Sequence, residues 1–329
     1  MSTVRILSTC ESILEALDKS ISLSHLQIKA MYNSMIGGII TDPAFMTIPI
    51  DDHMVHRGHV VFDTVSIVNG RAFTLQSHVN KIIRAATNAK IELPLSKEAM
   101  SSSLKQLAAS AGLRSCKIKY WISAGPGSMF IQPYPGMSVF YAIVLEGDAR
   151  NENQDISKEF TVNIPLNPRF LETMKSTNYL FNALSQVESK EKGGFMGIQK
   201  TQEGYIAESS IWKIGFVLPG GRFVIAANKD DAQDEEDQLI LAHANELLSQ
   251  GKLSSVGKRK IHIDEAKNCE EMFLSISDTI RPVLEWDGML IGNGTRGRIS
   301  QELIDYLQHD FANPDLSESI PYELYEATP

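Results

Sequence analysis

Two kinds of hydrophobic pattern alternate along the chain and separate helical from strand-rich stretches. Apolar residues recur at three- and four-residue spacing, which is typical of helices, over about 8–19, 76–90, 96–111, 177–191, 238–250 and 300–308. Short apolar runs bounded by turn residues predict strands over about 35–40, 60–68, 117–124 and 138–145, and again near 160, 260 and 272. Asn69-Gly70 lies between two such runs and is a strong hairpin signal, and turns at 202–204 and 219–221 predict two more hairpins. This mixture indicates an α+β fold.

A polar stretch divides the chain near its middle. Residues 146–159 are rich in Asp, Asn, Glu and Gln and contain almost no apolar side chains, so they predict a linker. At 329 residues, the chain is long enough for two hydrophobic cores. We therefore expect an N-terminal α+β domain over 1–147 with a helical appendage at its start, a linker over 148–158, and a C-terminal α+β domain over 159–329.

Charge and cysteine content narrow the class of partner. The chain carries 31 Lys and Arg against 40 Asp and Glu, a net charge of −9, which gives no general attraction to nucleic acid or to an anionic membrane. A small-molecule substrate is therefore the default expectation. Cys10, Cys116 and Cys269 lie far apart and match no metal-binding or disulfide spacing. Because the first residues also lack the basic and apolar regions of a targeting peptide, we expect a cytoplasmic protein.

Two other motifs resemble a metal site and a dinucleotide-binding site, but simpler interpretations are favoured for both. His53, His56 and His59 follow one another at three-residue steps, but Gly58 and the β-branched residues after it favour a loop that enters a strand over a metal site. Residues 292–297 match a dinucleotide-binding fingerprint, yet no second strand follows to complete the βαβ unit. We therefore expect neither a metal nor a dinucleotide.

One lysine and one glutamate carry the chemistry that the sequence supports best. Lys175 precedes the predicted helix at 177–191, and Glu208 lies at the end of a hairpin strand. A lysine in an enclosed cleft loses its charge more readily, and the neutral amine forms a Schiff base with an aldehyde. A carboxylate that faces a pyridine nitrogen keeps it protonated, so that the ring accepts electrons from a substrate carbanion. From spacing alone, a surface lysine and a solvated carboxylate remain the simpler alternative.

Several segments of the chain, taken in order, resemble one enzyme family. They are Met31–Ser34, Gly37–Pro43, Asp51–His59, Phe62–Thr64, Tyr120–Gly127, Lys175–Leu180, Gly204–Glu208, Arg281–Val283 and Trp286–Asp287. The combination is similar to the fold-type IV (class IV) pyridoxal-phosphate-dependent aminotransferases, and within them to the plant-type D-amino acid aminotransferase-like group. This resemblance covers about 30–310 of the chain.

The resemblance implies a fold, a cofactor and a set of site residues. Members of the family fold as two α+β domains, usually form homodimers, and hold pyridoxal 5'-phosphate between the domains. Their Schiff-base lysine, which is also the catalytic residue, maps onto Lys175, and the glutamate that pairs with the pyridine nitrogen maps onto Glu208. The resemblance also implies cofactor contacts for Lys81, Ser209, Ser277 and Thr279.

Three departures from the family pattern concern the cofactor phosphate. The family has an arginine three residues after a helical histidine, whereas here His78 is followed by Lys81, which keeps the charge but not the two-pronged hydrogen bond. Where the family has a Gly-x-Thr loop, residues 228–238 are mostly acidic and amide-bearing. In the turn 275–279, hydroxyls remain but stand beside Asp278. These changes predict weakened binding of the phosphate.

The first hypothesis is a pyridoxal-phosphate-dependent aminotransferase. It would move an amino group between an amino acid, with the D configuration as one candidate, and a 2-oxo acid. Lys175 would hold the cofactor and shuttle the substrate α-proton. Two alternatives stay open. A non-catalytic paralogue would keep the fold and the dimer without cofactor affinity, and a lyase of the aminodeoxychorismate type would use the same scaffold without a 2-oxo acid acceptor.

Overall fold

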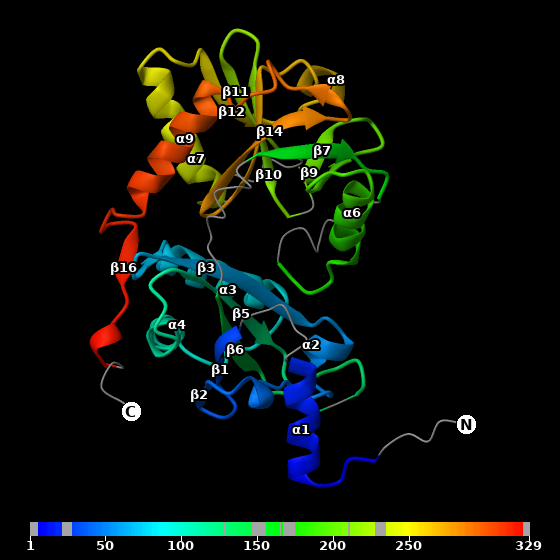
Figure 1. The fold of residues 1–329 in the computed structure, drawn as a ribbon, viewed down its shortest axis with the longest axis vertical. Helices are drawn as coiled ribbons and strands as arrows, with labels where there is room; N and C mark the ends of the chain where they lie inside the picture. The colour runs from blue at the N-terminus through cyan, green and yellow to red at the C-terminus, as the bar shows by residue number, and fades with distance from the viewer. Residues whose placement is uncertain are drawn as a thin grey trace. The chain divides into compact units, whose positions relative to one another are not determined.

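The computed structural model describes residues 6–21, 28–127, 129–146, 156–164, 166, 175–209, 211–227 and 235–324 (Figure 1). Their contacts form two compact units. The first unit holds the described residues of 1–149, 173–177 and 317–329, and the second holds those of 150–172 and 178–316. Each unit has its own sheet with helices packed against it, as expected for an α+β fold.

The described part of the first unit contains a seven-stranded antiparallel sheet. Its strand order is β16-β4-β3-β5-β6-β1-β2. The bounds are β1 Ile28–Asn33, β2 Gly38–Ile40, β3 Val60–Val68, β4 Arg71–Phe73, β5 Cys116–Ser123, β6 Val139–Leu145 and β16 Ser317–Ser319. β3 and β5 pair from Val60 opposite Ser123 to Ile67 opposite Cys116. The predicted hairpin at Asn69-Gly70 is confirmed, and both residues have the positive φ (52° and 77°) that a tight hairpin turn requires.

Two helices, α3 (Leu75–Asn88) and α4 (Lys97–Ser110), pack against one face of this sheet. Side chains alternate between the two faces of a strand, and the alternate residues Val61, Val65 and Tyr120 are buried in the core that these helices share with the sheet. The intervening residues of β3 and β5 therefore project from the opposite face.

The segment that precedes β3 covers one end of this opposite face. Its helices are η1 (Pro43–Phe45) and α2 (His53–His56), and the unit also contains α1 (Cys10–Ile21) and η3 (Tyr322–Leu324). The buried Asp52 side chain accepts hydrogen bonds from the Met54 amide and the Tyr141 hydroxyl, both at 2.8 Å, and from the Ser123 hydroxyl. This N-cap explains why α2 is a short helix and not the predicted loop.

The described part of the second unit contains a nine-stranded mixed sheet. Its order is β12-β11-β10-β13-β14-β7-β8-β9, with β15 paired to β14. The bounds are β7 Ser157–Thr161, β8 Gly197–Lys200, β9 Ile206–Ser209, β10 Lys213–Leu218, β11 Arg222–Ala226, β12 Ser255–Arg259, β13 Glu271–Ile276, β14 Thr279–Trp286 and β15 Met289–Leu290. The predicted hairpins at 202–204 and 219–221 join β8 to β9 and β10 to β11.

Four helices complete the described part of the second unit. They are α6 (Leu180–Glu191), α7 (Glu235–Ser249), α8 (Ile263–Ala266) and α9 (Arg298–Asp310). α7 and α9 lie side by side, and His243 of α7 binds Asp310 of α9 at 2.6 Å and stacks on Tyr306. The core on the sheet centres on the buried Trp286 and Phe216.

Two short segments belong by their contacts to the first unit, although they lie within 159–329. The Phe62 amide donates a hydrogen bond to the Lys175 carbonyl at 2.7 Å, so the chain around Lys175 lies along β3. β16 pairs with β4 at the edge of the same sheet. The sequence places both segments in a C-terminal domain because it carries no signal for such long-range pairing. The boundaries 1–147, 148–158 and 159–329 stay a prediction.

Two observations concern the environment of the chain. Among the described residues, no helix combines the length and the apolar character that crossing a membrane requires. Cys10 is exposed and Cys116 and Cys269 are buried, and all three are free thiols.

Candidate active site

Lys175 lies beside the strand β3 of the first unit. Its carbonyl accepts the Phe62 amide, and its Nζ lies 3.1 Å from Oδ1 of Asp63, the next residue of the strand. The lysine side chain is 26% exposed, whereas that of Asp63 is 2% exposed. One strand therefore fixes both the backbone and the amino group of Lys175.

Asp63 joins this lysine to the helix α3. Its Oδ2 accepts a hydrogen bond from Nδ1 of the buried His78 at 2.8 Å. Burial by itself raises the pKa of Asp63, but the charges of Lys175, His78 and Lys81 and the hydrogen bond from His78 outweigh it and hold the pKa well below its usual range. Asp63 is therefore ionised at neutral pH and forms an ion pair with Lys175.

Lys81 lies one helical turn after His78 on α3. Its positive charge is one of those that lower the pKa of Asp63, so it belongs to the same electrostatic cluster. A lysine offers an anion a single compact charge, where an arginine would offer a planar fork. Of the six predicted site residues, the structure brings Lys175 and Lys81 together around Asp63.

Glu208 and Ser209 end the strand β9 of the second unit. The Glu208 side chain lies outside the described residues, so its predicted contact with a pyridine nitrogen stays a prediction. The Ser209 hydroxyl is buried and has no hydrogen-bond partner among the described residues. A buried hydroxyl normally finds a partner, and its lack of one here fits a residue that binds a ligand.

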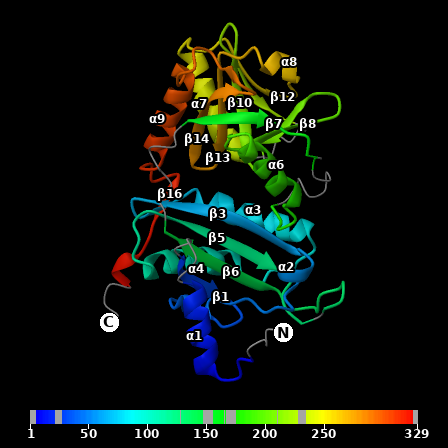
Figure 2. The ribbon, with the colours of Figure 1, turned by 45° about the vertical axis from the view of Figure 1, so that its right-hand side comes forward.

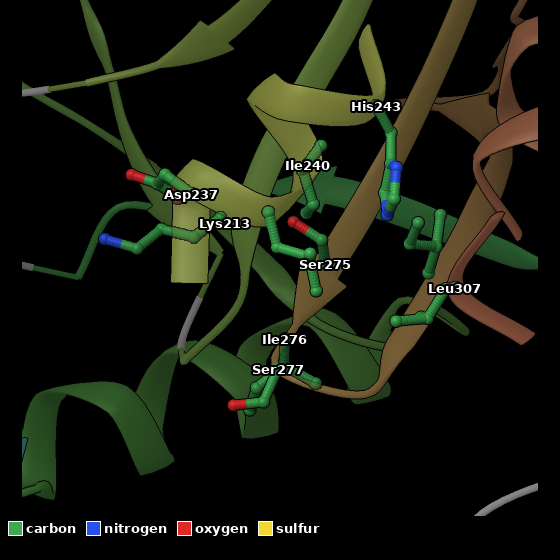
Figure 3. A pocket seen from close by; sticks show the side chains of 10 residues that line it. Lys213, Asp237, Ile240, His243, Ser275, Ile276, Ser277 and Leu307 are labelled. Atoms are coloured by element: carbon green, nitrogen blue, oxygen red, sulfur yellow. The ribbon is translucent and has the colours of Figure 1, made fainter. Parts of the chain in front are cut away.

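Ser277 and Thr279 lie at the turn between β13 and β14. The Thr279 hydroxyl donates to the neighbouring Asp278 carboxylate at 3.2 Å, so part of its hydrogen-bonding capacity is used locally. Ser277 lines a pocket in the second unit, together with Ser275 and Lys213 (Figure 3). The rest of the lining is mainly apolar, with Asp237 and His243, and the Lys213 amine points away from Ser275 in this view.

The acidic segment 228–238 is described only from residue 235 onwards, where α7 begins. Asp237 in the first turn of α7 is 2% exposed, and Oδ2 of its side chain lies 2.6 Å from Nζ of Lys258 on β12. Its charge is thus compensated inside the unit and does not face the pocket alone. Among the acids of 228–238, only the side chain of Asp237 is described, and its pairing with Lys258 reduces the repulsion that we expected between this segment and a phosphate.

These side chains fit pyridoxal phosphate by their chemistry. Lys175 has the primary amine that an aldehyde would require, and Lys81 has a cation of the kind that a phosphate would require. Ser209 offers a hydroxyl without a partner among the described residues, and Ser277 offers another at the pocket. The two groups of residues are carried by different units.

Sequence reasoning assigned no role to Asp63 or Lys213. Asp63 is the one acid in a strand that is otherwise apolar or hydroxyl-bearing, Val60–Val68, and a charged residue in such a strand is a signal for a buried ion pair. Lys213 starts the strand β10 and carries no comparable signal. The three histidines of Asp51–His59 lie close together, with the His53 and His56 rings 4.9 Å apart, but the described residues contain no cluster of metal-ligand type.

Comparison with known proteins identifies the family. The family model for amino-transferase class IV matches residues 60–286. A chloroplastic D-amino-acid transaminase of Arabidopsis thaliana is 38% identical over 301 residues, which cover 90% of this chain and 80% of that protein. A D-alanine aminotransferase of Listeria monocytogenes is 25% identical over 273 residues, which cover 79% of this chain and 89% of that protein.

The fold agrees with solved structures. The T.th. branched-chain amino acid aminotransferase, complexed with N-(5'-phosphopyridoxyl)-L-glutamate, superposes with a TM-score of 0.79 at 19% identity, covering 90% of this chain and 100% of that one. At this identity the likeness concerns the fold, which is that of the fold-type IV enzymes. With the match of the family model over most of its length, the chain is therefore a member of the class IV aminotransferases, which are pyridoxal-phosphate-dependent enzymes.

Proposed function

We propose that this chain transfers the amino group of a D-amino acid to a 2-oxo acid, with Lys175 as its catalytic residue. The observation that carries the proposal is the pairing of the Lys175 amine with the buried Asp63 on the strand β3. The D configuration rests on the 38% identity to the Arabidopsis D-amino-acid transaminase.

Three residues of the chain would have distinct roles in the proposed reaction. When bound, pyridoxal phosphate supplies an aldehyde and an electron-accepting ring. Lys175 Nζ accepts the substrate α-proton and later returns it, which makes it both general base and general acid. Asp63 stabilises the ammonium that Lys175 becomes when it takes up the proton, and His78 fixes the orientation of Asp63 through its hydrogen bond.

The remaining predicted residues would bind the cofactor. Lys81 would hold the phosphate, with Ser277 and Thr279 as hydroxyl donors. Ser209 would donate its hydroxyl, and Glu208 would pair with the pyridine nitrogen. The pairing of Asp237 with Lys258 supports retained phosphate binding, and so favours an enzyme over a non-catalytic paralogue.

Two further points belong to the proposal. A homodimer, which the resemblance to the family implies, is part of the proposal, and analytical ultracentrifugation of the purified protein tests it. A cytoplasmic location is consistent with the three free thiols among the described residues, and fractionation of the source cells tests it.

Absorbance and transamination assays test the proposed function. Pyridoxal phosphate added to the wild-type protein should give a yellow band that K175A lacks, and borohydride reduction followed by peptide mass spectrometry should locate the cofactor on Lys175. D-alanine with 2-oxoglutarate should yield pyruvate and glutamate, and K175A should lose at least about 10⁴-fold of this rate. K192A, which alters an exposed lysine, is the control.

Two outcomes contradict the proposal. Activity with L-alanine but not D-alanine refutes the D configuration, and product release without any 2-oxo acid indicates the lyase. If no band appears at excess cofactor while the protein is folded, the proposed function fails.

A further inference from the structure

A buried acid and a cation lie on the same face of two neighbouring strands of the second unit. β7 and β14 run side by side, with Ser157 of β7 opposite Val283 of β14 (Figure 2). Because the side chains of a strand alternate between its two faces, Glu159 shares the face of Ser157. Arg281 shares this face as well, since it lies two residues before Val283 on β14. The proposed reaction uses neither Glu159 nor Arg281.

The Glu159 carboxyl is buried without a full set of hydrogen bonds. The residue is 0% exposed, and its Oε2 accepts a hydrogen bond from the Met196 amide at 2.9 Å. Its Oε1 has no hydrogen-bond partner among the described residues, and neither has the hydroxyl of the nearby Ser157. A buried polar atom without a partner costs free energy when it is neutral, and far more when it is charged. The surroundings therefore favour the neutral carboxyl over the carboxylate.

Arg281 is the cation that acts on Glu159. Burial raises the pKa of Glu159 to about 8, and the charge of Arg281 opposes this rise. Other charged groups around these strands form ion pairs with one another, namely Lys158 with Glu285, Lys267 with Asp287 and Lys192 with Glu188, at 2.8, 2.6 and 2.8 Å. An ionised Glu159 would therefore attract Arg281 before any of them.

In the structure, Arg281 lies on an aromatic ring. Its Cζ is 4.2 Å from the centroid of the Phe195 ring. The Phe195 ring in turn meets the Trp212 ring edge-on, with the two centroids 5.9 Å apart. A ring attracts a cation less strongly than a full negative charge does in a buried site. Ionisation of Glu159 would therefore draw the guanidinium away from Phe195 and change the packing around Trp212.

Trp212 fixes the turn that follows β9. Ser209 and Trp212 exchange two backbone hydrogen bonds, of 2.7 and 3.1 Å, which close the turn between β9 and β10. The Ser209 hydroxyl is the one assigned above to the cofactor, and it has no partner among the described residues. The contacts that begin at Arg281 therefore end at Ser209.

We propose that Glu159 and Arg281 form a proton-controlled contact that sets the packing of Trp212. While Glu159 is neutral, Arg281 stays on the Phe195 ring and the turn at Ser209 is held. When Glu159 releases its proton to water, Arg281 leaves the ring and pairs with the carboxylate, and the turn loosens. The contact stands on these residues alone, whereas its effect on pyridoxal phosphate rests on the proposed function.

Tryptophan fluorescence of the full-length protein, titrated from about pH 6 to about pH 10 without cofactor, tests the contact. The wild type should show a change with a midpoint near the pKa of Glu159, about 8, and W212F should lose most of it. E159Q should show no such change, because its side chain has no proton to release. Constant far-ultraviolet circular dichroism separates the rearrangement from unfolding.

Variants of Arg281 identify the partner of Glu159. R281Q should move the midpoint upward by about half a pH unit, because the carboxylate loses the nearby cation, and R281K should stay near the wild type. K158Q is the matched control, since Lys158 adjoins Glu159 on β7 but pairs with Glu285 on the opposite face, and it should leave the midpoint unchanged.

Either of two results overturns the contact. One is a fluorescence change that persists in a folded E159Q, and the other is an unchanged midpoint in a folded R281Q. If either variant does not fold, infrared difference spectra of the wild type replace it. The band of a neutral carboxyl should disappear at the fluorescence midpoint, and its absence from the spectra also overturns the contact.

Absorbance titrations with pyridoxal phosphate at about pH 7 and about pH 9 test the link to Ser209. The Kd should rise between these values about fivefold more in the wild type than in E159Q, as expected for one weakened hydrogen bond. The comparison cancels the titration of the cofactor and of Lys175, which both proteins share. Equal rises overturn the link. If neither protein binds the cofactor, the proposed function fails, and the fluorescence titration still decides whether the contact exists.

Discussion

Among the described residues, each unit of the molecule buries one carboxylate in its sheet, and the two carboxylates behave in opposite ways. Asp63 on β3 and Glu159 on β7 are 1% and 0% exposed. The pKa of Asp63 lies well below its usual range, whereas burial raises the pKa of Glu159 to about 8. Equal burial therefore does not decide the charge of a carboxyl group.

The cations around each group explain the difference. Asp63 contacts the Lys175 ammonium and His78 directly. For Glu159, burial dominates, and the hydrogen bond from the Met196 amide, the nearby Ser157 side chain and the charge of Arg281 offset only part of its effect on the pKa. The acid with cations in contact, at the site proposed for catalysis, has a lowered pKa, whereas the acid without such contacts has a raised pKa.

The largest effect should follow from removing the charge of Asp63. D63N leaves Lys175 and His78 without their shared anion, and breaking a buried ion pair from one side costs about 4 kcal/mol of unfolding free energy. Urea denaturation at pH 7 measures it. D264N alters a carboxylate that is 89% exposed and should change stability by less than about 0.5 kcal/mol. Equal effects of the two substitutions would refute the ion-pair cluster.

Removing the charge of Glu159 should have the opposite sign. The pKa of Glu159 is about 8 in the folded chain and 4.5 as a free group, so between these values the folded state holds a proton that the unfolded state has released. The unfolding free energy of the wild type therefore falls as the pH rises through this window.

E159Q has no such proton to lose. It should match the wild type near pH 5 and exceed it by about 4 kcal/mol at pH 9. Urea denaturation at both pH values measures this, with the exposed Glu270 as the E270Q control. If the wild type is as stable at pH 9 as at pH 5, Glu159 is ionised throughout and the comparison with Asp63 fails.

A smaller effect is expected from His78. H78Q removes the imidazole that donates to Asp63 Oδ2 at 2.8 Å but leaves the pairing with Lys175, so it should cost about 1.5 kcal/mol. The same substitution at the exposed His309, H309Q, is the control for denaturation measurements. A loss as large as that of D63N would mean that His78, and not Lys175, provides most of the stabilisation.

The smallest effect on stability should come from Lys81. Its charge is the weakest of the influences that lower the pKa of Asp63, so K81A should change the unfolding free energy by less than about 0.5 kcal/mol. If it binds the cofactor phosphate, K81A should nevertheless weaken pyridoxal phosphate about tenfold in an absorbance titration. K81R should restore the affinity. Unchanged affinity in K81A would remove Lys81 from the proposed site.

Local signals explain which elements the sequence predicts. The strand pairing confirms all three predicted hairpin turns. They could be predicted because a glycine with positive φ lies in each of them. The strand β14 was missed because it contains Pro282, which lacks an amide for the ladder. In the structure β14 pairs with β7 only from Val283 onwards. Pro282 precedes this pairing, so its missing amide hydrogen costs no hydrogen bond to β7.

In the candidate site, too, only the residues that belong to local sequence motifs could be predicted. Lys175 and Glu208 follow from motifs that are contiguous in the sequence. The cluster around Asp63 joins residues 15 and 112 positions apart, and the pairing of Asp237 with Lys258 joins a helix to a strand. Such contacts depend on the packed fold, and neither spacing nor composition encodes them locally.

The pairing of β16 with β4 affects the order in which a growing chain can be completed. Ser317 binds Arg71, a residue that leaves the ribosome 246 residues earlier. During synthesis of the intervening chain, β4 therefore presents a strand edge that its final neighbour does not yet cover. The sheet whose strands are made first is therefore completed only when the last strand of the chain, β16, has been made.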